Sequence, residues 1–239
     1  MKAVILAAGT GSRLMPLTKE CPKCLLKIGR KPILSSMLEA IERSGIQDVV
    51  MVLGYLESQI REYVIQNHST INVEFLRNEK YDSTNTGYSL WLTQHLVKGG
   101  GLVKFDADVM FDEEILRRLV KKPGNYLCVD KNINLEAEEV KVETGLNDHV
   151  VRVGKGVDPN CAIGESIGIE RIDKESVDVL FDILDSLMEK PINHNDYYEK
   201  AYERMIEQGV PFKAMDITGL DWVEIDDRKD FEHACRLFT

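Results

Sequence analysis

The chain has 239 residues, of which 44% are hydrophobic and 29% are charged, and its formal net charge at pH 7 is −10. This length suits one α/β domain, the composition excludes a disordered chain, and the acidic balance argues against nucleic acid as a partner. No apolar run is long enough to span a bilayer, and the short apolar start is not a signal peptide, so we expect a cytoplasmic protein without a membrane partner. Five scattered cysteines favour reduced thiols, and the spacing of Cys21 and Cys24 alone does not predict a zinc site.

The chain begins with an apolar run, Lys2–Leu6, which we expect to be a buried strand. The loop that follows contributes glycines, a hydroxyl group and two cations: Gly9, Gly11, Ser12, Arg13 and Lys23. Glycines allow positive φ, successive N–H groups can form an anion-binding concavity, and the cations add positive charge. The stretch therefore predicts a triphosphate-binding loop at the carboxyl end of a parallel strand. On the two glycines alone, a plain tight turn is the alternative.

Strands and helices alternate after this loop. The spacing of apolar residues predicts a helix, a strand, a helix and a strand in turn: Lys31–Gly45, Asp48–Leu53, Leu56–Gln66 and Ile71–Leu76. Such alternation implies βαβ units and a parallel sheet, in which ligands bind beyond the carboxyl ends of the strands. Gly54 directly follows the second strand at such an end.

A polar loop then leads into a helix within Asn78–Leu92. Asn85 offers a donor and an acceptor, which suits reading the edge of a nucleobase. Thr86 and Ser89 follow it on the helix. From the residues alone, capping of the helix by Thr84 or Asn85 is the favoured interpretation, because such residues are common at helix starts.

The next strand, Leu102–Phe105, is buried and ends in Asp106-Ala107-Asp108. Two carboxylates at a strand end repel each other and need a cation or strong donors to stay ionised. Hard oxygen ligands of this kind suit Mg²⁺. The alternative is that one aspartate caps the following helix, Asp112–Lys121, but the position at a strand end favours a metal ion.

The later part of the chain contains shorter strands. We expect a strand at Tyr126–Val129, an antiparallel hairpin from Val140–Val142 and Val150–Val153, and a strand at Ile163–Ile172. Glu136, Glu138 and Glu139 read as a solvated charge run. Lys155, between two glycines, could reach the phosphate of an acceptor or lie in a plain exposed turn. Glu165, inside an isoleucine-rich strand, requires a partner or a ligand.

Two amphipathic helices follow, Asp173–Met188 and Asn195–Gln208, and the second carries Tyr197, Tyr198 and Tyr202. Aromatic faces attract ammonium groups, but aromatic residues at helical spacing are more often part of the core. The chain closes with two strands and a helix that Asp227 could cap: Pro211–Met215, Asp221–Ile225 and Arg228–Leu237.

The string G-x-G-S-R-L-x-P-L-T-x-x-x-P-K, from Gly9 to Lys23, resembles the signature of nucleotidyltransferases that join a nucleoside monophosphate to a small phosphorylated molecule. The resemblance implies an α/β fold, with a Rossmann-like, mostly parallel central sheet flanked by helices and a small antiparallel acceptor-binding lobe. It also implies one domain over residues 1–239. About 1–130 would bind the nucleotide, and about 131–239 would bind the acceptor and supply the closing strands.

The resemblance assigns roles to individual residues. Asp108 and Asp226 match the metal ligands for Mg²⁺, with Asp106 helping to position Asp108, and we expect Lys23 and Arg13 to be the catalytic cations. The implied nucleotide-binding residues are Leu6, Ala7, Ala8, Gly9, Gly11, Ser12, Arg13, Lys23, Gly54, Asn85, Thr86, Ser89 and Asp106. The expected acceptor-binding residues are Lys155, Glu165, Tyr197 and Tyr198.

No Ser-His-Asp or Cys-His arrangement stands out, so we expect the acceptor's own phosphate or phosphonate oxygen to attack the α-phosphorus of a nucleoside triphosphate directly. Short chains of this pattern resemble the CTP-using members of the family, and the pieces G-E-x-x-G-I at Gly164–Ile169 and W-x-E-I-D at Trp222–Asp226 favour their phosphonate- or choline-like branch. The CTP-using members include the choline-phosphate, 2-aminoethylphosphonate and inositol-1-phosphate cytidylyltransferases, which supply phosphonate, phospholipid or cell-surface precursors. The alternatives are a sugar-1-phosphate nucleotidyltransferase using dTTP, UTP or GTP, and a non-catalytic nucleotide sensor. The protein could also form a homodimer.

Overall fold

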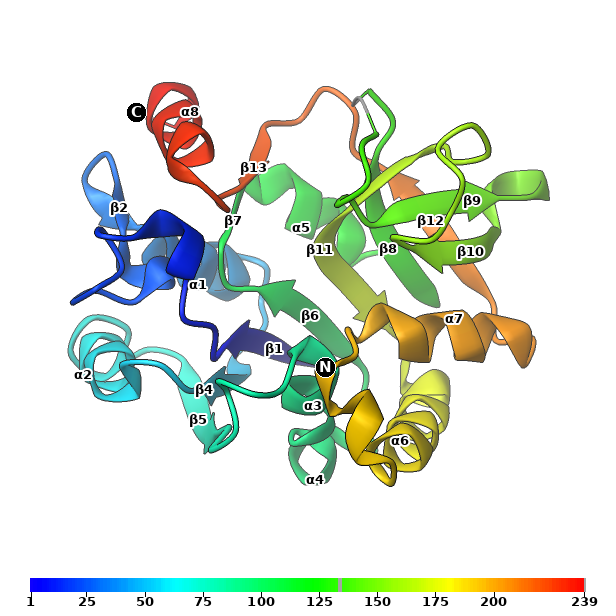
Figure 1. Ribbon diagram of the computed structural model, residues 1–239, viewed down its shortest axis with the longest axis horizontal. Coiled ribbons are helices and arrows are strands. Elements are labelled where there is room, and N and C mark those ends of the chain that lie inside the picture. Colours follow the sequence, from blue (N-terminus) through cyan, green and yellow to red (C-terminus); the bar gives the residue numbers. More distant parts are fainter. Residues whose placement is uncertain (133–134, 239) are drawn as a thin grey trace.

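The computed structural model describes residues 1–132 and 135–238 (Figure 1). Its centre is a mixed sheet in the order β10-β9-β11-β6-β1-β4-β5, with β8 beside β11 and β12 beside β8. The strands of this sheet are β1 (Lys2–Ala7), β4 (Asp48–Leu53), β5 (Asn72–Arg77), β6 (Leu102–Asp106), β8 (Asn125–Asp130), β9 (Lys141–Thr144), β10 (Val150–Gly154), β11 (Gly164–Ile172) and β12 (Phe212–Asp216). Two short ladders lie outside it: β2 (Lys27–Ile28) with β3 (Lys31–Pro32), and β7 (Val109–Phe111) with β13 (Trp222–Glu224).

Helices connect and cover these strands. The α-helices are α1 (Ile33–Arg43), α2 (Glu57–Asn67), α3 (Thr86–Trp91), α4 (Gln94–Val97), α5 (Glu113–Leu119), α6 (Lys174–Met188), α7 (Glu199–Glu207) and α8 (Arg228–Leu237). Short 3-10 turns lie at η1 (Ser12–Leu14), η2 (Lys23–Leu25), η3 (Leu146–Asp148) and η4 (Pro191–Asn195). In the part of the chain that is described, no helix combines the length and the apolar character needed to cross a membrane.

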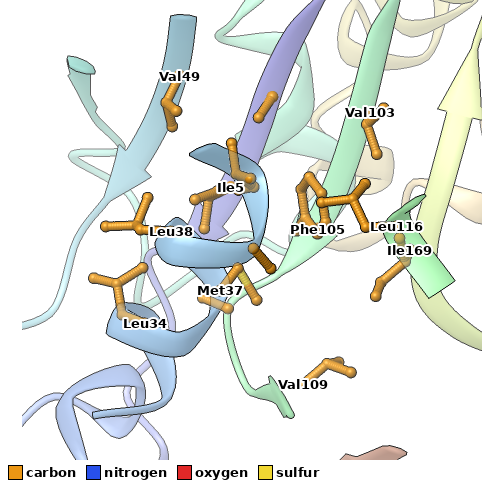
Figure 2. Packing of buried hydrophobic residues seen from close by; sticks show 14 of the residues in the cluster. Ile5, Leu34, Met37, Leu38, Val49, Val103, Phe105, Val109, Leu116 and Ile169 are labelled. Carbon is orange, nitrogen blue, oxygen red and sulfur yellow. The ribbon is translucent and has the colours of Figure 1, made fainter. Parts of the chain in front are cut away.

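The first half of the sheet is parallel, as the alternation of elements predicts. β1 pairs in parallel with β4 and β6, and β4 pairs in parallel with β5. Side chains alternate along β1, so Ile5 packs on the face covered by α1 and α5, while Val4 packs on the face covered by α6 and α7. Figure 2 shows Leu34, Met37 and Leu38 of α1 gathered against the first of these faces. Burial on both faces explains the continuous apolar runs of these strands.

The second half of the sheet contains the antiparallel lobe that the family resemblance implies. β11 runs antiparallel to β6, β8 and β9, and β9 and β10 form the expected hairpin. β12 returns in parallel beside β8. The fold is therefore a mostly parallel sheet flanked by helices, with a small antiparallel lobe, and this prediction is confirmed.

Two local differences from the sequence-based expectation affect the cavity described below. The second amphipathic helix was expected from Asn195, but α7 begins at Glu199, because Pro191–Asn195 forms a 3-10 turn and Tyr198 is the residue before the helix. The strand Val109–Phe111 was not predicted, because three residues are too few for a periodic pattern. Its pairing with β13 brings Trp222–Glu224, from near the end of the chain, beside the segment that follows β6.

Candidate functional site

A cavity of about 350 Å³ opens beside the carboxyl ends of β1 and β6. The wall that we call the loop side is formed by residues of the glycine-containing loop and of the β7–β13 region: Leu6, Ala7, Gly9, Gly11, Ser12, Arg13, Lys23, Asp108, Glu224 and Asp226. The wall that we call the lobe side comes from β11, from the turns of the lobe and from the start of α7: Glu138, Lys155, Glu165, Ser166, Gly168, Tyr197, Tyr198 and Glu199. Asn85, Thr86 and Asp106 line the cavity as well.

The glycine-containing loop folds back on itself between β1 and α1. Its turn passes through Gly11, whose φ of 62° lies in the left-handed region. A Cβ at this position would lie 3.0 Å from Thr18 Cγ2 and 3.1 Å from Lys23 Cβ, so the close approach requires glycine. The Thr18 hydroxyl donates a hydrogen bond of 2.8 Å to the Gly11 carbonyl. Lys23 is thereby held against the beginning of the loop.

Backbone pairing in the small β7–β13 ladder places Asp108 beside Asp226. Asp108 lies between β6 and β7, and Asp226 follows β13. Val109 is opposite Glu224, and the N–H group of Ile225 donates to the Asp108 carbonyl at 3.1 Å. Two carboxylates from distant parts of the sequence therefore meet because their backbones are hydrogen-bonded.

Lys23 connects the loop to these two carboxylates. Its Nζ lies 2.7 Å from Asp108 Oδ2 and 2.9 Å from Asp226 Oδ1. A guanidinium nitrogen of Arg13 lies 2.7 Å from the same Asp226 oxygen. Burial alone would lower the pKa of Lys23, but the charges of the two aspartates outweigh burial and the pKa is raised. Lys23 is therefore a permanent positive charge at the centre of the loop side.

Three carboxyl groups on the loop side fit a divalent cation. Asp108, Glu224 and Asp226 each offer one oxygen, and these oxygens all lie within 4.8 Å of one another. Asp108 Oδ1 is buried, and it has no hydrogen-bond partner among the described residues. Although Glu224 is open to the cavity, removal of water by the surrounding protein and then the charges of Asp108 and Asp226 raise its pKa to about 9. Crowded carboxylates with an unsatisfied oxygen are the ligand set that a hard cation completes.

Asp106 is held by the protein beneath the cavity and is not tied to Asp108. Its Oδ2 accepts hydrogen bonds from Lys104 Nζ at 2.8 Å and from the Tyr198 hydroxyl at 2.7 Å. Lys104 is fully buried, and its Nζ also lies 2.9 Å from Glu170 Oε2. Gly168, with a φ of 75°, leaves the necessary space, since a Cβ there would lie 2.6 Å from Asp106 Oδ2. Strands β6 and β11 thus fix the orientation of Asp106 together.

Lys155 and Tyr197 meet on the lobe side, and Tyr198 lies against Lys104. Lys155 Nζ lies 3.1 Å from Glu138 Oε2 and 4.8 Å from the centre of the Tyr197 ring. Tyr198 is buried, and Lys104 Nζ lies 3.5 Å from the centre of its ring. Tyr202 is fully buried and does not line the cavity, as the core interpretation predicts.

At the start of α3, Asn85 both caps the helix and lines the cavity. The Asn85 side chain accepts from the N–H group of Thr86 at 2.8 Å, so it caps α3, and both residues line the cavity. Ser89 is buried and accepts from Asn78 Nδ2 at 3.1 Å, away from the cavity lining.

Two further expected nucleotide-binding residues, Ala8 and Gly54, also lie outside the lining. A Cβ on Gly54 would lie 2.6 Å from the Ala8 carbonyl oxygen and 2.5 Å from Tyr81 Cβ. Gly54 is therefore required by tight packing behind the loop. Ala8, whose carbonyl accepts from the Tyr55 N–H group at 3.1 Å, helps to hold that packing.

Sequence reasoning missed several residues of the site. Glu224 lies inside the W-x-E-I-D piece, so its nearness to Asp226 was visible, but its partnership with Asp108 depends on the unpredicted strand β7. Glu199 lines the cavity because α7 starts later than its apolar pattern suggests. Lys104 stands within an apolar run, and only the antiparallel placement of β11 reveals its partner Glu170.

The chain belongs to the nucleotidyl transferase family, whose model matches residues 2–130, and it is therefore a nucleotidyltransferase. It is 28% identical to a CTP:phosphoglutamine cytidylyltransferase of Campylobacter jejuni, with 97% of this chain and 98% of that protein covered. It is 36% identical to a choline-phosphate cytidylyltransferase of Streptococcus pneumoniae over 60% of this chain and 62% of that protein.

Solved structures support the fold. A CTP:phosphocholine cytidylyltransferase from Streptococcus pneumoniae is similar with a TM-score of 0.82, at 23% identity, over 100% of this chain and 99% of that chain. A UDP-glucose pyrophosphorylase is similar with a TM-score of 0.83, at 16% identity, over 99% of this chain and 97% of that chain. Because enzymes of both kinds share the fold, the fold alone does not determine the base or the acceptor.

Proposed function

We propose that this nucleotidyltransferase uses CTP and Mg²⁺ and transfers CMP to a small phosphate or phosphonate, with release of pyrophosphate. The observation that carries the proposal is the meeting of Lys23 with Asp108 and Asp226, at 2.7 and 2.9 Å, beside the glycine-containing loop. It joins a triphosphate-binding loop to an acidic cluster that fits a divalent cation. The choice of CTP is supported by the similar relatives, which are named as cytidylyltransferases with phosphorylated acceptors.

In the proposed reaction, an oxygen of the acceptor's phosphate or phosphonate forms a bond to the α-phosphorus. The bond between the α-phosphorus and the oxygen that bridges to the β-phosphate breaks, and pyrophosphate leaves. We assign Lys23 to the charge that develops at the α-phosphate, and Arg13 and the N–H groups of the loop to the β- and γ-phosphates. A Mg²⁺ ion held by Asp108 and Asp226, with Glu224 beside them, would supply further neutralisation of the phosphate charge.

The nucleoside part of CTP is assigned to the region between the two sides of the cavity. Asn85 and Thr86 line this region, and Asn85 retains its amide N–H donors after its oxygen caps α3. Asp106 Oδ2 is already occupied by Lys104 and Tyr198, so any contact with the nucleotide falls to its other oxygen. Ser89 and Gly54 are assigned a supporting part, because packing behind the cavity explains both.

The acceptor is assigned to the lobe side, with Lys155 toward its phosphate or phosphonate group. We divide the single domain accordingly, with about 1–130 for the nucleotide and about 131–239 for the acceptor. This division is supported by the match of the family model to residues 2–130.

The proposal is tested by measuring pyrophosphate release with CTP, UTP, dTTP and GTP against phosphocholine, phosphoethanolamine, 2-aminoethylphosphonate, inositol 1-phosphate and glucose 1-phosphate. We expect release with CTP and a small phosphate or phosphonate, and loss of release when EDTA removes the metal. Release with dTTP, UTP or GTP and glucose 1-phosphate alone would establish a sugar-1-phosphate nucleotidyltransferase. Binding of a nucleotide without release in any combination would indicate a sensor.

A further inference from the structure

Glu165 is a buried carboxylate on the lobe side that has no partner. It lies on β11 opposite Asp130 of β8 and Lys141 of β9, is only 6% exposed, and lines the cavity. Within residues 1–132 and 135–238, no hydrogen bond or ion pair reaches its side chain. A carboxylate removed from water in this way is costly unless a cation or donors accompany it.

Lys141, which is opposite Glu165 in the pairing of β11 with β9, cannot fill this role, because its donors are used elsewhere. Lys141 Nζ donates to the backbone carbonyl groups of Glu136 at 2.9 Å, Ala137 at 3.3 Å and Glu139 at 3.0 Å. An ammonium group has three N–H donors, and these contacts account for all of them. Burial and then the negative charges of Glu139 and Asp130 raise the pKa of Glu165 to about 8, with a smaller opposing effect from Lys141.

Beneath the lobe side, carboxyl groups also outnumber the lysine that pairs with them. The buried ammonium group of Lys104 pairs with Asp106 and Glu170, and the charge of Glu199 acts on it as well. Glu199 lines the cavity, and its Oε2 is buried without a hydrogen-bond partner among the described residues. A positively charged ligand on the lobe side would therefore meet a negative environment from two directions, β11 and the start of α7.

Two aromatic rings on the lobe side already contact lysines of the protein. Lys104 Nζ lies 3.5 Å from the centre of the Tyr198 ring, and Lys155 Nζ lies 4.8 Å from that of Tyr197. Tyr202 packs between Tyr198 and Phe212 in the core. A quaternary ammonium group carries no N–H donor and is recognised by free aromatic faces. The lobe side offers a buried carboxylate instead, which suits a cation with N–H donors.

On the basis of the function proposed above, we propose that the acceptor carries a cationic group with N–H donors, such as a primary ammonium, and that Glu165 binds this group. The class of acceptor is thus a small aminoalkyl phosphate or phosphonate. Quaternary ammonium compounds are disfavoured because they bring no N–H donor to the buried carboxylate, and sugar phosphates without an amino group because they bring no counter-charge.

The proposal is tested with a graded series of acceptors and CTP. The series is phosphoethanolamine, its N-methyl and N,N-dimethyl derivatives, phosphocholine, and ethyl phosphate, which lacks the amino group, with glucose 1-phosphate as an outgroup. We expect kcat/KM to fall by at least about 10-fold from phosphoethanolamine to phosphocholine, and further to ethyl phosphate, as the charged hydrogen bond is lost. An equal or higher kcat/KM for phosphocholine or glucose 1-phosphate overturns the assignment, although nucleotidyl transfer itself stands.

The variant Glu165→Gln tests whether Glu165 is the residue that binds the ammonium group. It should lower kcat/KM for phosphoethanolamine by about 10-fold or more while changing that for ethyl phosphate by less than about 3-fold, because only the cationic acceptor loses a charge-assisted bond. Glu143→Gln, on the neighbouring strand β9 and outside the cavity lining, is the matched control. An equal loss for both acceptors overturns the role of Glu165 as the ammonium ligand. Absence of pyrophosphate release with every nucleotide and acceptor would overturn the proposed function and this inference together.

Discussion

The loop side and the lobe side of the cavity balance their charges in opposite ways. On the loop side, Lys23 and Arg13 contact the carboxylates of Asp108 and Asp226 directly, at 2.7 to 2.9 Å. On the lobe side, Glu165 has no partner within the described residues, and the carboxyl groups around Lys104 outnumber it. This difference is the basis for the two roles proposed above, in which the loop side holds phosphates and a cation and the lobe side receives a positively charged group.

The largest effect is expected on the loop side from Lys23→Ala. Removal of the central cation should lower kcat/KM for CTP by about 10³-fold, because one preorganised donor at a developing charge contributes about 10²–10³-fold and Lys23 also carries charge. Pyrophosphate release measures this loss, and circular dichroism checks that the fold is intact. Lys27→Ala, an exposed lysine on β2, should retain nearly full activity. Near-normal turnover of the Lys23 variant would remove Lys23 from the catalytic machinery.

The buried charge cluster beneath the lobe side should respond through stability. Lys104→Met leaves the carboxyl groups of Asp106 and Glu170 without their shared cation, so the free energy of unfolding should fall by about 3–5 kcal/mol. Urea denaturation measures the change. Lys98→Met replaces an exposed lysine and should have an effect within about 0.5 kcal/mol. Similar losses in the two variants would show that the Lys104 network contributes little.

The same cluster predicts a pH dependence that Glu199→Gln should remove. Burial raises the pKa of Glu199 to about 7 from its ordinary 4.5, so the folded state binds a proton that the unfolded state releases between these values. The stability that this group contributes is present below pH 4.5 and is lost as the pH rises through 7. Glu199→Gln removes this pH dependence. The free energy of unfolding of the variant minus that of the wild type should therefore be larger at pH 8 than at pH 4.5, by an amount on the order of 3 kcal/mol.

Thermal unfolding at several pH values measures this difference. Glu207→Gln, an exposed position on the same helix α7, is the control and should follow the wild-type profile. Parallel profiles of the wild type and the Glu199 variant would contradict the assignment of the slope to Glu199.

A smaller effect is expected from two glycines that share a left-handed backbone but differ in their surroundings. Gly168→Ala places a Cβ on a residue with a φ of 75°, and Gly99→Ala places one on a residue with a φ of 85°. The left-handed backbone alone should cost each variant about 1–2 kcal/mol of stability. Only at Gly168 would the Cβ meet another atom, Asp106 Oδ2 at 2.6 Å. The Gly168 variant should therefore lose about 1–3 kcal/mol more in urea denaturation and should also raise KM. Equal costs for the two variants would show that Asp106 moves aside without penalty.

The sequence predicted the loop side more completely than the lobe side, for a physical reason. A glycine-containing loop needs particular residues at fixed spacing, so Gly11, Arg13 and Lys23 are visible in one short string. Asp108 is visible as well, because it follows a buried strand. The antiparallel hairpin and the helix after Asp227 were also predicted, since alternation and a capping residue are local signals.

The lobe side depends on contacts between distant strands, which no local pattern records. Lys104 is stabilised inside an apolar strand because β11 brings Glu170 to it. Its contact with the ring of Tyr198, the residue before α7, joins segments that are far apart in the sequence. Glu165 was recognised as a carboxylate in need of a partner, but its isolation follows from the three carbonyl groups that occupy Lys141. Asp106 was expected to support Asp108, and its actual partners were likewise out of reach of the sequence.

The most direct measurement follows the phosphorus atom itself. CTP labelled with ³²P at the α-position, or in a parallel reaction at the γ-position, is incubated with the protein, Mg²⁺ and phosphoethanolamine, and the products are separated. We predict that the α-label appears in a cytidylylated acceptor and that the γ-label appears only in pyrophosphate. Transfer of the γ-label to the acceptor, or no movement of either label, would contradict cytidylyl transfer at the site formed by Lys23, Asp108 and Asp226.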